Sequence, residues 1–197
     1  VKGSELFTIR IRDLATGADL ADEIPDTRGA VWANSSVLFY VKLDENHRPL
    51  SVWRHVRGTS ANEDVCVYEE KDAGFYVGVS RTQSGRFVQI VAHDHQTTEI
   101  YLIDANDPFG AARMVAPRRF GHEYGVEHHG DRLIISTNSG DAEDFRIVTA
   151  PVSDPREANW TELIPHKPGR LILDMVCYAN HIARLELVLI EADEAAQ

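Results

Sequence analysis

Acidic side chains concentrate in three short polar segments of this 197-residue chain: DENHRP at 44–49, HDHQTTE at 93–99 and NSGDAED at 138–144. Carboxylates held along a low-dielectric wall raise the local concentration of cationic ligands, such as peptides bearing Arg or Lys. A substrate-steering face is therefore one hypothesis, and its alternative is a solvated rim that keeps the protein soluble or pairs with basic residues of a partner domain. The residues concerned are Asp44, Glu45, Asp94, Glu99, Asp141, Glu143 and Asp144.

Histidines are the second group with suitable chemistry, because imidazole nitrogens are common zinc ligands. His93 and His95 point to the same side of an extended segment, and His122, His128 and His129 follow later. A zinc site needs three or four converging ligands. The repeat described below puts the first pair between a second and a third strand, but His128 and His129 between a first and a second strand. Such connections emerge on opposite faces, so we expect hydrogen-bonded structural histidines and no metal site.

A serine nucleophile is not recognisable in the chain. An α/β-hydrolase needs a strained G-x-S-x-G elbow, and the nearest match is Gly78-Val79-Ser80, which continues as Arg81-Thr82. Ser80 is therefore expected to be a turn residue. The glycine-containing segments at 15–17 and 84–85 do not lead into a helix, so they are not phosphate cradles. No catalytic residue and no cofactor is predicted.

A repeat must position all these residues. A short apolar strand, a polar turn and a second apolar strand recur as AVWANSSVLFYV, YVGVSRTQSGRFVQIV and YGVEHHGDRLIIST. Aligned second strands put Phe39, Phe87, Leu133 and Ile182 in one column, at spacings of 48, 46 and 49 residues by subtraction of these numbers. A period of about 40 to 50 residues is typical of β-propeller blades. The prediction is an all-β chain of four-stranded antiparallel blades.

The repeat divides the chain into one partial propeller without a linker. We expect three full blades and two half blades, so strands at both ends lack partners and invite association through exposed blade edges. The two cysteines, Cys66 and Cys177, lie in apolar strand patterns and are expected to be buried free thiols. The predicted bounds are about 1–26, 27–72, 73–118, 119–168 and 169–197.

Composition excludes some classes of function. The chain has 43% hydrophobic and 26% charged residues and a formal net charge of −11, which disfavours nucleic acid as a partner. No apolar run approaches the roughly 18 residues of a membrane span, and the first residues alternate like a strand instead of forming a signal peptide. A cytoplasmic protein without a membrane partner is expected.

Several contiguous strings resemble one known family. They include IRIRDLATGADL, FYVKLDENHRP, VYEEKDAGFYVGVSRTQSGRFV, AHDHQTTEIYLIDA, VEHHGDRLIISTN, AEDFRIVTAPV and PHKPGRLILD. Together they resemble, over roughly residues 4–185, the propeller domain of the oligopeptidase B group within the prolyl oligopeptidase family of serine peptidases. Two departures are NSS at 34–36, where an Asp-Ser turn is usual, and the tail from Leu187 onward.

The resemblance implies a seven-bladed propeller that caps an α/β-hydrolase catalytic domain absent from this chain. The parent enzyme would cleave short peptides after Arg or Lys, and the propeller would limit substrate size. This chain alone would be the noncatalytic part, inactive by itself. The alternative is a stand-alone propeller scaffold that binds proteins, or a degenerate remnant without enzyme activity.

Overall fold

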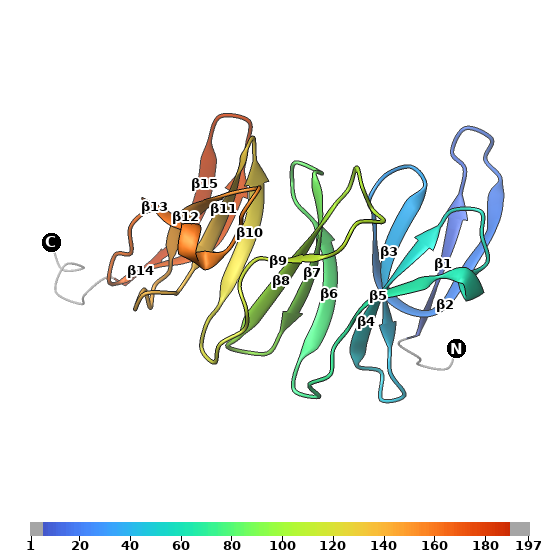
Figure 1. Ribbon diagram of the computed structural model, residues 1–197, viewed down its shortest axis with the longest axis horizontal. Helices are drawn as coiled ribbons and strands as arrows, with labels where there is room; N and C mark the ends of the chain where they lie inside the picture. Colours follow the sequence, from blue (N-terminus) through green and yellow to red (C-terminus); the bar gives the residue numbers. More distant parts are fainter. Residues whose placement is uncertain (1–5, 190–197) are drawn as a thin grey trace, which may run out of the picture. The chain divides into compact units, whose positions relative to one another are not determined.

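The computed structural model describes residues 6–189, which form antiparallel sheets in two compact units (Figure 1). Unit 1 holds the described residues up to Arg81 together with 85–95 and 100–113, and unit 2 holds 82–84, 96–99 and the described residues from Met114. Within 6–189 the only helices are two short 3₁₀ turns, η1 (Ala61–Glu63) and η2 (Glu157–Asn159). No helix in this described range is long and apolar enough to cross a membrane. The all-β prediction is confirmed.

Unit 1 contains two sheets. The five-stranded sheet has the order β1-β2-β3-β4-β5, and the next has the order β6-β7-β8-β9. The strands of the first are β1 (Phe7–Arg12), β2 (Asp19–Trp32), β3 (Val37–Leu43), β4 (Pro49–Val56) and β5 (Val65–Glu69). Those of the second are β6 (Tyr76–Arg81), β7 (Phe87–His93), β8 (Thr98–Asp104) and β9 (Arg113–Met114).

Unit 2 repeats the four-stranded pattern in the order β10-β11-β12-β13 and adds a hairpin, β14-β15. The hairpin is the half blade expected from residue 169, and residues 190–197 of that expectation lie outside the described part. The strands are β10 (Tyr124–His129), β11 (Arg132–Thr137), β12 (Arg146–Pro151), β13 (Thr161–Ile164), β14 (Arg170–Cys177) and β15 (Ile182–Val188).

The sheets stack face to face within each unit, as blades of a propeller do. In unit 1 the central strand β3 is buried from Val37 to Val41, and its Phe39 packs in one cluster with Val77 and Ile90 of the neighbouring sheet. In unit 2 Ile134 and Ile147 pack against Ile172 of the β14-β15 hairpin. A strand covered on both faces needs apolar residues at consecutive positions, which explains runs such as VLFYV.

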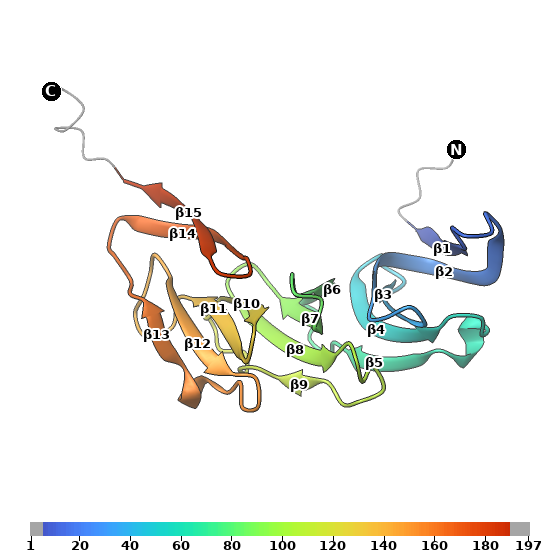
Figure 2. The same ribbon diagram turned by 90° about the horizontal axis from the view of Figure 1, so that it is seen from above.

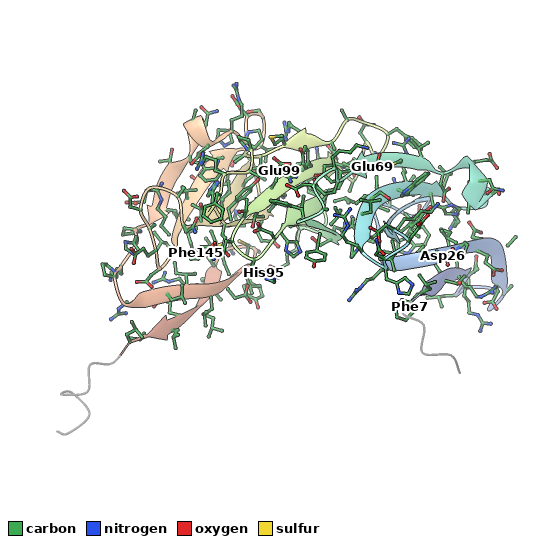
Figure 3. The ribbon with its side chains drawn as sticks, turned by 90° about the horizontal axis from the view of Figure 1, so that it is seen from below. Phe7, Asp26, Glu69, His95, Glu99 and Phe145 are labelled. Atoms are coloured by element: carbon green, nitrogen blue, oxygen red, sulfur yellow. The ribbon has the colours of Figure 1, made fainter. Side chains whose placement is uncertain are left out.

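The expected boundary between a half blade at 1–26 and a blade at 27–72 lies inside a single strand. The 14-residue strand β2 pairs first with β1 and then with β3, so all five strands share one sheet (Figure 2). Positive φ angles of 57° at Asp26 and 72° at Gly29 bend β2 where its pairing passes from β1 to β3. Phe7 and Asp26 both lie on this hairpin (Figure 3). The ladder continues through the bend, and no turn separates the two segments.

The two cysteines differ from each other. Cys177 is buried and free, as expected, whereas the free Cys66 is exposed, so its predicted burial is wrong. Cys66 lies in β5, the last strand of its sheet in the order of pairing. An edge strand is only partly covered by its neighbours, which accounts for the error.

Candidate functional site

The turn between β3 and β4 carries the first predicted steering residues. The Asp44 carboxylate accepts hydrogen bonds from the backbone N–H groups of Asn46 and Arg48, both at 2.9 Å, and from Arg48 Nε at 3.2 Å. The Arg48 backbone hydrogen bond is the main cause of the lowered pKa of Asp44. This carboxylate therefore holds its own turn and is neutralised by a neighbour. Glu45 beside it is exposed.

Glu99 does not join an exposed acidic set. It lies in strand β8, only 5% exposed, where its carboxylate accepts from the backbone N–H and the guanidinium of Arg118, both at 3.0 Å. The steering role predicted for Glu99 conflicts with this burial. The reason is that β8 begins at Thr98, earlier than the acidic segment suggested. Asp94 stays in the β7–β8 connection and is half-buried.

The third acidic segment connects β11 with β12. Asp144 accepts a 2.6 Å hydrogen bond from the backbone N–H of Gly169, so it fastens the start of the β14-β15 hairpin. Asp141 and Glu143 are exposed. Because the predicted carboxylates are divided between the two units, a common acidic face remains a prediction. Its best members are Glu45, Asp141 and Glu143.

The predicted histidines make individual hydrogen bonds. In unit 2, His128 Nδ1 lies 2.9 Å from Ser84 Oγ, and His129 Nε2 lies 2.8 Å from the carbonyl oxygen of Ala179. His93 Nδ1 lies 3.2 Å from the carbonyl oxygen of Asp94. No group of three or more His, Cys, Asp or Glu residues within 6–189 is arranged to hold a metal ion.

Ser80 lies in a strand, and its assignment to a turn is wrong. It is part of β6 and pairs with Gln89 of β7. The β6–β7 turn begins only after Arg81, because the hairpin register continues to the Arg81–Val88 pair. Ser80 therefore occupies a regular ladder position, whereas an elbow nucleophile needs a sharp strand-to-helix turn.

A buried ionic network in unit 1 has no counterpart in the sequence-based expectations. The His55 side chain is fully buried, with Nε2 2.9 Å from Asp22 Oδ1 and Nδ1 2.7 Å from Asp64 Oδ1. The Tyr40 hydroxyl donates to Asp64 Oδ2 at 2.9 Å, and the Gly58 N–H donates to Asp22 Oδ1 at 2.6 Å. Four segments of the first sheet, β2, β3, β4 and the approach to β5, therefore meet at one imidazole.

The two carboxylates decide the charge of this imidazole. Burial by itself lowers the pKa of His55, but the hydrogen bonds with Asp22 and Asp64 outweigh burial, and the pKa is raised. An ionised carboxylate can only accept, so two ionised partners favour a ring that donates from both nitrogens, an imidazolium. Burial likewise raises the pKa of Tyr40, helped by its bond to Asp64. The network joins four segments of the first sheet through buried side chains.

One sequence signal pointed to this network. Asp22 stands in the same alternation phase as Leu20 and Ile24, which face the core side of the β2 strand. A carboxylate in an apolar phase requires a buried partner. The partners lie 33 and 42 positions later in the sequence, by subtraction from His55 and Asp64, so no local pattern identifies them.

Unit 2 buries a histidine of a different kind. His122 is 4% exposed, stacks on Tyr124 with ring centroids 5.1 Å apart, and lies 6.1 Å from the Trp160 ring. Its Nε2 is 3.1 Å from Thr137 Oγ1. Burial, and then the nearby Arg119, lower the pKa of His122. The lowered pKa favours the neutral imidazole, which packs among the aromatic rings.

Comparison with known proteins gives the family. The family model described as the N-terminal β-propeller domain of prolyl oligopeptidase matches residues 1–188. The chain belongs to this propeller family. Protease 2 of Moraxella lacunata is 37% identical over 156 residues, and dipeptidyl aminopeptidase BI of Pseudoxanthomonas mexicana is 36% identical over 168 residues. These alignments cover 77% and 84% of this chain but 22% and 23% of the relatives.

Solved structures agree with the propeller assignment. Oligopeptidase B from Leishmania major superposes with a TM-score of 0.85 at 30% identity, covering 92% of this chain and 26% of that protein. Oligopeptidase B from Trypanosoma brucei gives a TM-score of 0.78 at 34% identity, covering 85% and 24%. The chain thus corresponds to about a quarter of these peptidases, all within the propeller.

Proposed function

We propose that this chain is the noncatalytic propeller part of an oligopeptidase B-like serine peptidase. The parent enzyme hydrolyses short peptides after Arg or Lys, and the propeller limits access to an α/β-hydrolase domain of the same protein. The similarity to the two oligopeptidase B structures over 85% or more of the chain carries this proposal. The chain also lacks a G-x-S-x-G elbow, so its role is one of access and binding.

Access control follows from the physics of a cap over a reaction site. A flexible peptide threads a narrow opening at little cost, whereas a folded protein would first have to unfold. The Trypanosoma brucei relative is described in a closed form with covalently bound antipain. A closed state is what a size-limiting cap requires.

Activity assays test the proposal. The 197-residue chain and the longer protein that contains it would be assayed with fluorogenic peptides ending in Arg, Lys or Ala, and with a folded protein of matching sequence. We expect no turnover by the chain alone, and turnover of Arg and Lys peptides only by the longer protein. Serine-inhibitor-sensitive hydrolysis by the chain alone would contradict the noncatalytic role. Equal rates for Ala and Arg peptides would contradict the basic preference.

Electrostatic steering of basic peptides is part of the proposal and has its own test. In the longer protein, Glu45, Asp141 and Glu143 would be replaced by their amides, which preserves size and removes three exposed charges. Exposed charges act through a field screened over about 10 Å at 0.1 M salt. We therefore expect a lower kcat/KM for dibasic peptides at low salt and little change at high salt. An equal loss for neutral peptides would show a structural role instead.

A further inference from the structure

Unit 1 contains a basic cavity that is separate from the acidic turns and from the buried network. Its lining is that of a binding site. Its volume is about 490 Å³, and both sheets of the unit contribute to its walls. Basic or hydrogen-bonding side chains dominate the lining, and none of the lining residues, all in the described part of the chain, is acidic. In a protein of net charge −11 this is an unusual local composition. The polar lining residues are Arg28, Asn46, His47, Arg48, Tyr76 and His93.

The backbone is irregular where it meets this cavity. The β2–β3 register shifts between Arg28 and Ala30, so Gly29 is an extra residue in a bulge. His47 adopts a φ of 61°, a left-handed conformation that costs a residue other than glycine some stability. Bulges turn side chains to new directions, and strained residues concentrate at functional sites. Two such irregularities at one cavity point to a ligand.

The cavity walls are held in place without using Arg28. Arg48 Nη1 donates to the carbonyl oxygens of Asp72 at 2.9 Å and Phe75 at 3.3 Å, so the β3–β4 turn is tied to the segment before β6. The remaining charge of Arg48 is matched by Asp44. Tyr76 and His93 are directly paired across β6 and β7. The arrangement is therefore preorganised.

We propose that this cavity binds a carboxylate, namely the free C-terminal carboxylate of a short peptide. A guanidinium fork matches a carboxylate, and the His47 imidazole with the Tyr76 hydroxyl supplies further donors. His93 Nδ1 faces the carbonyl oxygen of Asp94, so this ring donates to a ligand through Nε2 only when it is protonated. The identity of the ligand as a peptide rests on the proposed function. Carboxylate binding itself is independent of the proposed function, because it is measured on this chain without any catalytic assay.

The test is a titration of the 197-residue chain followed by the histidine side-chain NMR signals. The probes are N-acetyl-Gly-Arg, the same dipeptide as its C-terminal amide, and inorganic phosphate. We expect the acid to shift the His47 and His93 signals saturably, the amide to bind at least tenfold more weakly, and phosphate to bind more weakly than the acid. Equal binding of acid and amide would overturn the proposal. Tighter binding of phosphate would overturn the carboxylate assignment.

Variants separate binding from folding. Arg28→Gln should weaken binding of the dipeptide acid at least tenfold. Arg10→Gln is a matched change at an exposed ion pair on the same hairpin and should leave the affinity unchanged. His47→Gly removes both the donor and the backbone strain, so it should weaken binding while keeping or raising the urea midpoint. Equal affinities of the Arg28 and Arg10 variants for the dipeptide acid would contradict the proposed site. Carboxylate binding by this chain, combined with no peptide hydrolysis by the longer protein, would contradict only the proposed function.

Discussion

The two units each bury one histidine, and their surroundings shift the pKa values of the two rings in opposite directions. His55 in unit 1 lies between the carboxylates of Asp22 and Asp64, and its pKa is raised. His122 in unit 2 lies among aromatic rings near Arg119, and its pKa is lowered by burial first. Both rings are buried, so their different partners determine the direction of each pKa shift. Burial of a histidine therefore does not by itself fix the direction of its pKa shift.

The largest effect is expected from removing a carboxylate of the charged network. Asp64→Ala leaves His55 Nδ1 and the Tyr40 hydroxyl without a partner in a fully buried place, while His55 Nε2 keeps its contact with Asp22. Breaking a buried ion pair in this way costs about 3–5 kcal/mol. Urea unfolding in a Trp160→Phe background, where fluorescence reports Trp32 and Trp53 of unit 1, measures the loss.

Asp64→Asn provides the control for that variant. The amide keeps one acceptor for the imidazole and the shape of the side chain, so the loss should be clearly smaller than for Asp64→Ala. If both variants unfold at the wild-type urea concentration, the network contributes nothing to the stability of unit 1.

A smaller effect is expected at the neutral histidine. His122→Phe keeps the aromatic packing against Tyr124 and Trp160 but loses the hydrogen bond with Thr137. The expected cost is about 1 kcal/mol. Hydrogen exchange of the β10–β11 amides reports unit 2 directly. Thr137→Val removes the same bond from the other side, together with the one that Thr137 Oγ1 accepts from the Ser139 N–H. The double variant should therefore cost no more than Thr137→Val alone; additive costs would show that the bond is not shared.

The smallest effect is expected at the surface ion pair of the β1–β2 hairpin. Arg12 Nε lies 2.7 Å from Asp19 Oδ1, but the side chains are 59% and 63% exposed. Exposed pairs are screened by water and salt. Asp19→Asn should therefore leave the urea midpoint unchanged. A loss comparable to that of Asp64→Ala would mean that burial does not separate the two pairs.

The strands and the period of the fold were predictable, because a covered central strand needs consecutive apolar residues. Phe87, Leu133 and Ile182 lie in the second strands of their sheets, and Phe39 lies in β3, the third strand of the five-stranded sheet. The fusion of the first hairpin into one sheet was not, because the polar residues between Ile24 and Ala30 look like a turn, whereas irregular positions at Asp26 and Gly29 keep them within β2. Sequence distance likewise concealed the Asp22–His55 pairing.

Candidate sites were harder to predict than strands. The acidic segments were recognised by composition, but composition does not tell that Glu99 pairs with Arg118 or that Asp44 holds its own turn. The basic cavity was not predicted from the sequence, because Arg28 and His93 come from different sheets. Such groupings depend on the stacking of blades, which single segments do not encode.

The opposite pKa shifts also predict opposite pH dependence for the two units. The contribution of His55 is complete below about pH 6.5, the ordinary pKa of histidine, and is lost as pH rises through its raised folded pKa. Unit 2 instead loses stability as pH falls below about 6.5, because the unfolded chain takes up a proton that buried His122 does not. Urea unfolding between pH 5 and 9, with each unit monitored separately, should show the two trends.

Direct observation of the ring nitrogens tests the central comparison most simply. In ¹⁵N-labelled chain at pH 7, above the ordinary histidine pKa, two protonated ring nitrogens should be seen for His55 and one for His122. Assignment relies on His55→Gln and His122→Phe, each of which removes one set of signals. His55 should titrate above the ordinary histidine pKa and His122 below it. A neutral His55 at pH 7, or identical titration of the two rings, would contradict it.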